Sequence, residues 1–270
     1  MPCFAESERR ELVSHGVEFD VYKTIFTLTN RSDVVAMKTF RRAIDVSVRR
    51  RRAPVLNHAI EQWCALQHPN IHPVYGIYEL SSPDMSILTP FCQDGNVLEY
   101  LASHRSANKS KLVLELALGL AYIHSRNMAH GNIKPENVLI YKGKACITDI
   151  GVSSLLQLAH FQEGGYLSPP QGWMYKPLEE LWAADTGGNL AATPARDMFA
   201  FAHVVYHMYM GRPFWHPKRL NKRLLAPPEV ENMSQVPGPH EIPVQVWSVL
   251  QRCWAQNITM DKVVGKLQEI

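Results

Sequence analysis

Apolar stretches and short polar turns alternate along the first third of the chain. Between Phe19 and Phe40, two segments rich in aromatic and β-branched residues flank the polar run 29–33, a pattern that predicts a β-hairpin. Helical spacing of apolar residues follows from Pro54 to Leu66, and short strands are predicted at 72–80 and 85–91. This part of the sequence therefore predicts a small, strand-rich lobe.

After Asn96 the pattern changes to longer helical segments. The segment Lys111–Arg126 places four apolar residues on one stripe, which predicts a helix that is buried along that face. The stripe consists of Leu112, Leu116, Leu120 and Ile123. Further on, we expect short strands at 137–141 and 145–150, an irregular loop at 164–177, and helices at 196–210 and 244–256. The remainder of the chain therefore predicts a larger, mainly helical lobe.

Composition narrows the class of protein only a little. The 270 residues are 46% hydrophobic and 20% charged, which is ordinary for a globular protein. A net charge of +3 is too small to indicate a nucleic-acid ligand. No stretch approaches the ~20 apolar residues that a membrane-spanning helix needs, and the first residues lack the apolar core of a secretory signal. The cysteines are scattered singly, which favours a reducing compartment over disulfides or structural zinc. We therefore expect a cytoplasmic protein without a transmembrane segment.

Basic residues are concentrated in one region, at Arg41, Arg42 and 49–52. We expect a solvated loop here. The alternative interpretation is a patch that binds a protein partner or an anionic membrane.

Four segments, in order along the chain, carry the chemistry. They are Val35-Ala36-Met37-Lys38, His130-Gly131-Asn132-Ile133-Lys134-Pro135-Glu136-Asn137, Asp149-Ile150-Gly151, and Arg196–Phe201 followed by Gly211–Phe214. They resemble the V-A-I-K, H-R-D-L-K-P-E-N and D-F-G signatures and the late helix of protein kinases. With supporting matches at 68–71 and 252–254, the resemblance covers the chain from about Ser14 to its end. The His-Gly and Cys-Trp pairs are most similar to the tyrosine-kinase-like branch, of fungal type.

The resemblance implies an α+β, bilobal fold formed by one protein-kinase-like domain over residues 1–270. The small β-rich lobe would span 12–89, the hinge 90–95 and the larger helical lobe 96–270. Phosphoryl transfer depends on positioning and charge neutralisation, so ATP and Mg²⁺ are the implied cofactors and protein chains the implied partners or substrates.

The same resemblance assigns roles to single residues. Lys38 would hold the α- and β-phosphates, Asn137 and Asp149 would hold Mg²⁺, and Lys134 would lie near the transferred phosphoryl group. His130 and Asp197 would brace the catalytic loop. The remaining nucleotide-site positions are Gly16, Val21, Ala36, Thr89 and Cys92, the last either as a reactive thiol or as a small buried hydrophobe.

The pattern breaks at the catalytic base, where Asn132 stands in place of the family's aspartate. An amide can orient a hydroxyl group, but it cannot accept the proton at neutral pH. Losing a positioned general base typically costs about 10²–10⁴-fold in rate, or about 3–5 kcal/mol.

The phosphate-covering loop and the helix carboxylate are also altered. Of the three glycine positions only Gly16 remains, and Phe19 occupies the third, where a side chain obstructs the approach of phosphate to the backbone. The glutamate that should pair with Lys38 falls on Ala59. Glu61 lies two residues further on, about 200° around the helix, and we expect it to face solvent.

Two charges that normally pair are lost together. Leu178 replaces the glutamate of A-P-E, although Glu179 is a candidate substitute, and the chain after Trp254 skips the segment that would carry the partner arginine. Losing both partners leaves no unpaired buried charge, so the fold stays viable.

These departures lead to three hypotheses. The leading one is a pseudokinase that binds ATP–Mg²⁺ weakly and acts through a protein partner. The second is a slow but active Ser/Thr or dual-specificity protein kinase. The third is a small-molecule phosphotransferase, disfavoured by the Lys-Pro-Glu-Asn run, the Asp-Ile-Gly segment and the Arg-Asp helix.

Overall fold

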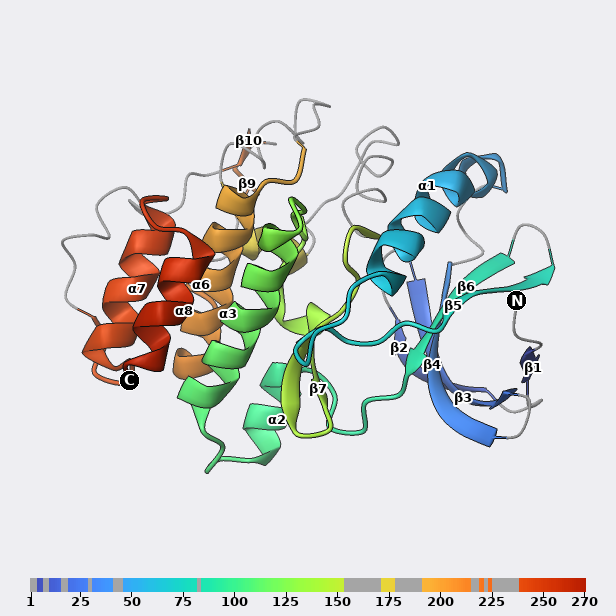
Figure 1. Ribbon diagram of the computed structural model, residues 1–270, viewed down its shortest axis with the longest axis horizontal. Helices are drawn as coiled ribbons and strands as arrows, with labels where there is room; N and C mark the ends of the chain where they lie inside the picture. Colours follow the sequence, from blue (N-terminus) through green and yellow to red (C-terminus); the bar gives the residue numbers. More distant parts are fainter. Residues whose placement is uncertain are drawn as a thin grey trace. The chain divides into compact units, whose positions relative to one another are not determined.

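A computed structural model describes residues 4–6, 10–15, 19–28, 31–40, 46–81, 84–152, 171–177, 191–214, 219–220, 223–224 and 238–270. Gly16, Leu178, Glu179 and the arginines at 41 and 42 lie outside these ranges. The chain forms two compact units (Figure 1). Unit 1 comprises Met1–Gln67 with Ile71–Gln93, and unit 2 comprises His68–Asn70 with Asp94–Ile270.

Unit 1 is an antiparallel sheet with one helix. Its strands are β1 (Phe4–Glu6), β2 (Glu11–His15), β3 (Phe19–Leu28), β4 (Arg31–Phe40), β5 (Gly76–Ser81) and β6 (Asp84–Pro90). The strand order is β1-β3-β4-β6-β5, and β2 also pairs with β3. The predicted hairpin is confirmed as β3 and β4, and the two later strands as β5 and β6.

The register of these strands decides which residues share a face. Tyr22 lies opposite Met37, which lies opposite Leu88, and this face forms a cluster of buried side chains. The cluster consists of Phe26, Val35, Met37 and Leu88, with Tyr22, Tyr75 and Tyr78 packed against it. On the other face, Val21 lies opposite Lys38. The lysine is therefore held on the side of the sheet away from the apolar cluster.

Helix α1 (Val46–Cys64) begins eight residues before the predicted start, and Pro54 lies inside it. The predicted start was wrong because proline was taken as the first helical residue, although a helix can lose one backbone hydrogen bond and continue. The run at 49–52 therefore belongs to a helix, not to a loop, in keeping with the high helix propensity of arginine. Leu56, Ala59, Ile60 and Trp63 form its buried face, with the indole N–H of Trp63 donating to the carbonyl of His72.

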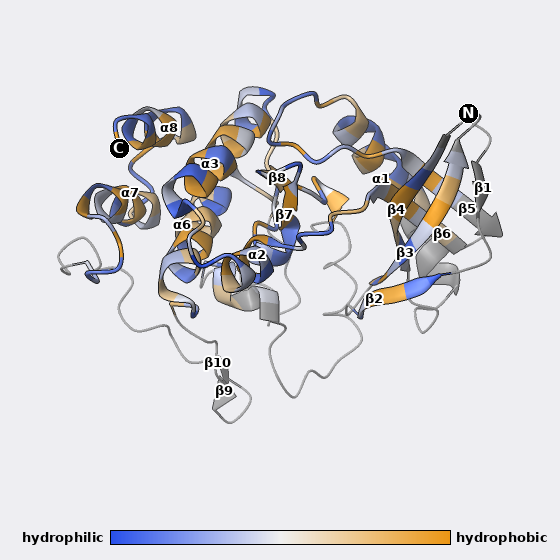
Figure 2. Cartoon of the chain, turned by 90° about the horizontal axis from the view of Figure 1, so that it is seen from below, coloured by the Kyte–Doolittle hydropathy of each residue, from blue (hydrophilic) through white to orange (hydrophobic). Residues whose placement is uncertain are grey.

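Unit 2 is mainly helical. Its helices are α2 (Val97–Ser103), α3 (Lys109–Ser125), α6 (Pro194–Met210), α7 (Val244–Trp254) and α8 (Met260–Gln268), with 3-10 turns η1 (Pro135–Asn137) and η2 (Gln171–Tyr175). Two short hairpins complete it: β7 (Val138–Tyr141) with β8 (Lys144–Ile147), and β9 (Arg219–Leu220) with β10 (Arg223–Leu224). Helices α3, α6, α7 and α8 lie side by side in Figure 1, and each carries both hydrophobic and hydrophilic residues along its length (Figure 2).

Most elements predicted for this unit are confirmed. The stripe on α3 is buried as expected, since Leu116, Leu120 and Ile123 are fully enclosed and Leu112 is 4% exposed. The strand pair around Lys142 and the two long helices also form where predicted. The predicted loop at 164–177 needs a correction, because residues 171–175 form η2. Helices α2 and α8 were not predicted, although Asn96 and Glu99 form a capping box at the start of α2.

Residues 68–70 belong to unit 2 although they lie between two stretches of unit 1. The Asn70 carbonyl accepts the N–H of Ile147, and the Asn70 side chain donates to the carbonyl of Ala145, which anchors the segment to β8. A Cβ at Gly119 of α3 would lie 2.7 Å from the Asn70 carbonyl oxygen. Glycine is therefore required for α3 to approach this segment so closely.

Candidate functional site

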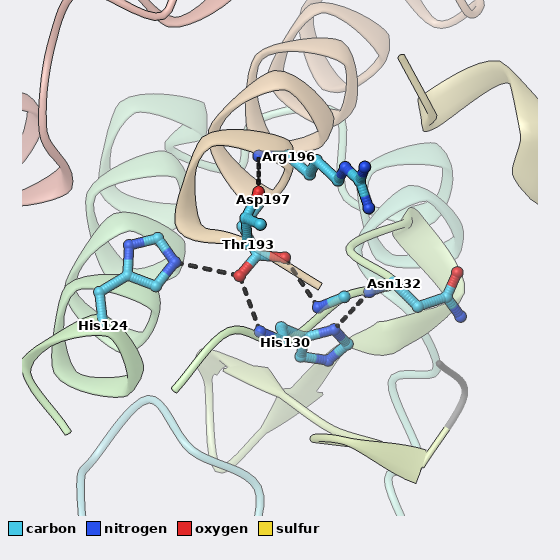
Figure 3. Close-up of polar contacts among 7 residues, drawn as sticks. His124, His130, Asn132, Thr193, Arg196 and Asp197 are labelled. Carbon is cyan, nitrogen blue, oxygen red and sulfur yellow. Dashed lines mark hydrogen bonds and ion pairs between the residues drawn. The ribbon is translucent and has the colours of Figure 1, made fainter. Parts of the chain in front are cut away.

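The loop His130–Asn137 of unit 2 is held by the carboxylate of Asp197, at the start of α6. Its Oδ2 accepts the backbone N–H of His130 at 2.7 Å and the Nε2–H of His124 at 3.0 Å, while Oδ1 accepts the N–H of Gly131 at 2.8 Å (Figure 3). Asp197 is 1% exposed. Hydrogen bonds to a buried carboxylate are among the strongest in proteins, so this side chain fixes the start of the loop.

His130 connects the loop to the segment before Asp149. Its ring is completely buried, Nε2 donates to the carbonyl of Thr148 at 2.8 Å, and Nδ1 accepts the N–H of Asn132 at 3.1 Å. These two partners require a neutral ring with its proton on Nε2. Burial lowers the pKa of His130, with a smaller opposing effect from the charge of Asp197, and so favours that neutral form.

Asn132, the residue at the base position, is 8% exposed and held by its backbone. Its N–H is bound by His130, and its carbonyl accepts Nδ2–H of Asn137 at 2.9 Å. That bond identifies Nδ2 of the Asn137 side chain as the donor. The other polar atom of the side chain, Oδ1, is therefore the oxygen of the type that binds a cation. The arrangement supplies a fixed amide where a fixed carboxylate would act as base.

Asp149 lies two residues after the end of β8 and is 4% exposed. The Asn137 carbonyl accepts the N–H of Thr148 at 3.0 Å, which brings Asp149 next to the loop. The backbone of Asp149 has φ = 62°, in the left-handed region that non-glycine residues rarely adopt. Such conformations persist at functional sites because the surrounding contacts enforce them.

Together these contacts gather Asn132, Asn137 and Asp149 at one place in unit 2. Lys134 precedes η1 in the same loop, and its carbonyl accepts the N–H of Asn137 at 2.9 Å. Carboxylate and amide oxygens are ligand types that Mg²⁺ accepts, usually together with water and phosphate oxygens. Within the described ranges no group of three or more His, Cys, Asp or Glu side chains forms a metal cluster. Asn137 and Asp149 thus bring together two side chains with oxygen atoms of the types that Mg²⁺ accepts.

In unit 1, Lys38 and four other predicted site residues occupy β3, β4, β6 and the segment after β6. Val21 lies opposite Lys38, and Ala36 lies opposite Thr89, which is 8% exposed. Cys92 is half-buried, with Sγ 3.9 Å from both ring nitrogens of His72. Gly16, the remaining predicted residue, lies outside the described residues.

On α1, Ala59, which the sequence predicts at the family's glutamate position, is 3% exposed, whereas Glu61 is exposed to solvent, as expected from its place on the helix. Lys38 also has an aromatic contact, because its Nζ lies 4.9 Å from the centroid of the Phe19 ring. From the sequence, Phe19 was predicted only as an obstruction to phosphate, and neither this contact nor His124 as a partner of Asp197 was predicted.

The comparisons with known proteins define the family. Residues 8–267 match the family described as protein tyrosine and serine/threonine kinase, and the chain belongs to this family. Human retinal guanylyl cyclase 2 is 28% identical over 219 residues, which are 75% of this chain and 19% of the cyclase. The serine/threonine-protein kinase SSK22 of Saccharomyces cerevisiae is 26% identical over 270 residues, covering 94% of this chain and 20% of that kinase.

A shorter match is to the MAP kinase kinase kinase wis4 of Schizosaccharomyces pombe, 37% identical over 109 residues, or 39% of this chain and 7% of wis4. The chain thus spans a fifth or less of the length of these relatives. Across the part of the chain that the structure describes, no helix combines the length and apolarity needed to cross a bilayer.

Proposed function

We propose that this chain is a pseudokinase domain that binds ATP–Mg²⁺ weakly and acts by binding a protein partner. The observation that carries the proposal is the neutral amide of Asn132 at the base position of a loop that is otherwise braced by Asp197 and His130. Because the loop is held in place, the presence of Asn132 instead of an aspartate changes the chemistry of the site and not the folding of the loop. The tyrosine-kinase-like subgroup and the cytoplasmic location stay predictions.

The residues that remain support binding more than catalysis. Oδ1 of Asn137 and the carboxylate of Asp149 would hold Mg²⁺, which when bound neutralises phosphate charge. Lys134 would contribute a positive charge nearby. The Asn132 amide would orient a hydroxyl group by hydrogen bonding, yet an amide cannot itself accept the hydroxyl proton at neutral pH. One similar relative is named for another activity, as a guanylyl cyclase, and the stretch that matches this chain is 19% of its length.

Asn132→Asp tests the missing base. We expect metal-dependent phosphorylation of a generic protein substrate to rise about tenfold, below the 10²–10⁴-fold typical of a positioned base, because the altered loop and lysine environment remain. Radiolabelled phosphate transfer measures it, and Asn132→Asp combined with Asp149→Ala is the matched control that should abolish the gain. Robust transfer by the unaltered chain would contradict the proposal.

Nucleotide binding is tested separately by thermal unfolding. ATP with Mg²⁺ at about 100 times its Kd is expected to stabilise the chain by about 2.7 kcal/mol. Asp149→Ala should remove the part of this shift that depends on Mg²⁺. An unchanged melting curve at every nucleotide concentration, with and without Mg²⁺, would remove nucleotide binding from the proposal while leaving the partner-binding role.

The second candidate, a slow Ser/Thr or dual-specificity kinase, is favoured by the intact bracing of the loop. It predicts phosphate transfer by the unaltered chain that disappears in Lys38→Met and Asp149→Ala. Phosphate transfer by the unaltered chain, together with loss of that transfer in both variants, would replace the leading proposal by this one.

A further inference from the structure

Phe19 and Lys38 lie on the same face of the unit 1 sheet. In the register of β3 and β4, Val21 is opposite Lys38, and residues two apart on a strand point to the same side. The Lys38 ammonium lies 4.9 Å from the centroid of the Phe19 ring, and Phe19 is only 6% exposed although it is the first residue of its strand. The ring is therefore packed in place beside the ammonium group.

We propose that Phe19 sets the ligand class of this face, which would bind an uncharged planar heterocycle such as a nucleoside in preference to a nucleoside triphosphate. The inference rests on the proposed function, since it takes Lys38 as the lysine that would meet the phosphates. It goes further by naming the residue that decides between the two classes of ligand.

The physical reason is competition for the ammonium group. The face of an aromatic ring is electron-rich, so it attracts a lysine cation and repels phosphate oxygens. A phosphate oxygen must come within about 2.7–2.9 Å of Nζ to form a charge-assisted hydrogen bond. The ring closes the side of Nζ that it faces, so a phosphate that approaches from this side must displace Phe19, which removes the cation–π attraction and exposes buried apolar surface.

A nucleoside does not need to displace Phe19, because the other predicted contact residues, Ala36 and Thr89, lie further along the strands. Ala36 is opposite Lys23, four residues along β3 from Phe19, and Thr89 is opposite Ala36 on β6. A planar ring system at Ala36 and Thr89 is thus separated from the Phe19 ring along the strand direction.

The experiment measures the Kd of adenosine and of ATP with Mg²⁺ by calorimetry for the unaltered chain and for Phe19→Ala. In the unaltered chain adenosine is expected to bind more tightly than ATP with Mg²⁺. In Phe19→Ala the affinity for ATP is expected to rise about 3- to 30-fold, which corresponds to the usual strength of a cation–π contact, while that for adenosine stays the same. Ile25→Ala is the matched control, because Ile25 is on the same strand and face but is 47% exposed and lies opposite Val34.

The gain must also depend on Lys38, so it should be absent from Phe19→Ala combined with Lys38→Met. An ATP-to-adenosine ratio that is unchanged in Phe19→Ala overturns the inference, and so does a failure of that variant to bind either ligand. If Phe19→Ala does not fold, Phe19→Leu decides, because it keeps the apolar bulk without a π face and should show a smaller rise in the same direction.

A readout without ligand gives an independent check. Proton resonances of the Lys38 side chain next to the ring should be shifted by the ring current in the unaltered chain and return to ordinary values in Phe19→Leu. Unshifted resonances in the unaltered chain would overturn the inference. Phosphate transfer by the unaltered chain would instead contradict the proposed function. It would not change the ratio of the ATP and adenosine affinities, which tests the inference separately.

Discussion

Asp197→Ala is expected to lower the free energy of unfolding by about 3–5 kcal/mol. The substitution removes an almost fully buried carboxylate that accepts hydrogen bonds from the backbone of His130 and Gly131 and from the ring of His124. Removing one partner of a buried charged network leaves the others without their acceptor, which is the costly case. Urea unfolding followed by circular dichroism measures the change.

Thr193→Ala is the matched control for Asp197→Ala, because Thr193 caps the same helix by accepting the N–H of Arg196 at 3.3 Å. Loss of such a cap costs about 1 kcal/mol. If Asp197→Ala destabilises the chain no more than this control, the carboxylate acts only on the start of α6 and does not brace the loop.

A second large effect is expected from pH through His203 of α6. This ring is buried among aromatic side chains, stacked on Phe199 at 4.3 Å, and its Nδ1 accepts the indole N–H of Trp254 at 2.8 Å. An indole nitrogen can only donate, so the ring proton is on Nε2, which has no hydrogen-bond partner in the described structure. Burial lowers the pKa of His203 to about 4, and the nearby Phe199 carbonyl opposes this only in part.

The direction of the pH effect follows from that lowered pKa. Above about pH 6.5 the ring is neutral in both the folded and unfolded chain, and its contribution to stability is complete. As the pH falls towards 4, the unfolded chain binds a proton that the folded chain does not, so up to about 3 kcal/mol is lost. Urea unfolding at a series of pH values measures this slope. His203→Gln can still accept from Trp254 but does not titrate, and equal slopes for the two chains would contradict the assignment.

The fold could be predicted from the sequence where long periodic patterns exist. The apolar stripe of α3 and the alternating hairpin of β3 and β4 each bury one face against a core, so their spacing is visible in the sequence. Helix α2 has 7 residues, too few for a clear period, whereas α8 buries Met260, Val263 and Leu267 at helical spacing and was overlooked. The early start of α1 was missed because a proline in a sequence commonly marks the first turn of a helix, whereas Pro54 lies inside this helix.

The candidate site was predicted residue by residue, but its contacts were not. The prediction that Glu61 faces solvent is confirmed, because a helix has a fixed rotation per residue and the position two residues from Ala59 lies on another face. The contact between Phe19 and Lys38 depends on strand register and on a side-chain orientation, neither of which a motif records. A motif also does not record the contact of His124, because its partner Asp197 lies 73 positions away along the chain.

Because residues 68–70 belong to unit 2, the protein cannot be cut into its two units at one position. A fragment that begins at Asp94 would lack Asn70, so the N–H of Ile147 and the carbonyl of Ala145 on β8 would lose their partners. The surface of α3 that Gly119 leaves open for this segment would also be uncovered. No single junction therefore separates the units cleanly, and exchange of one unit with that of a relative requires at least two crossover points.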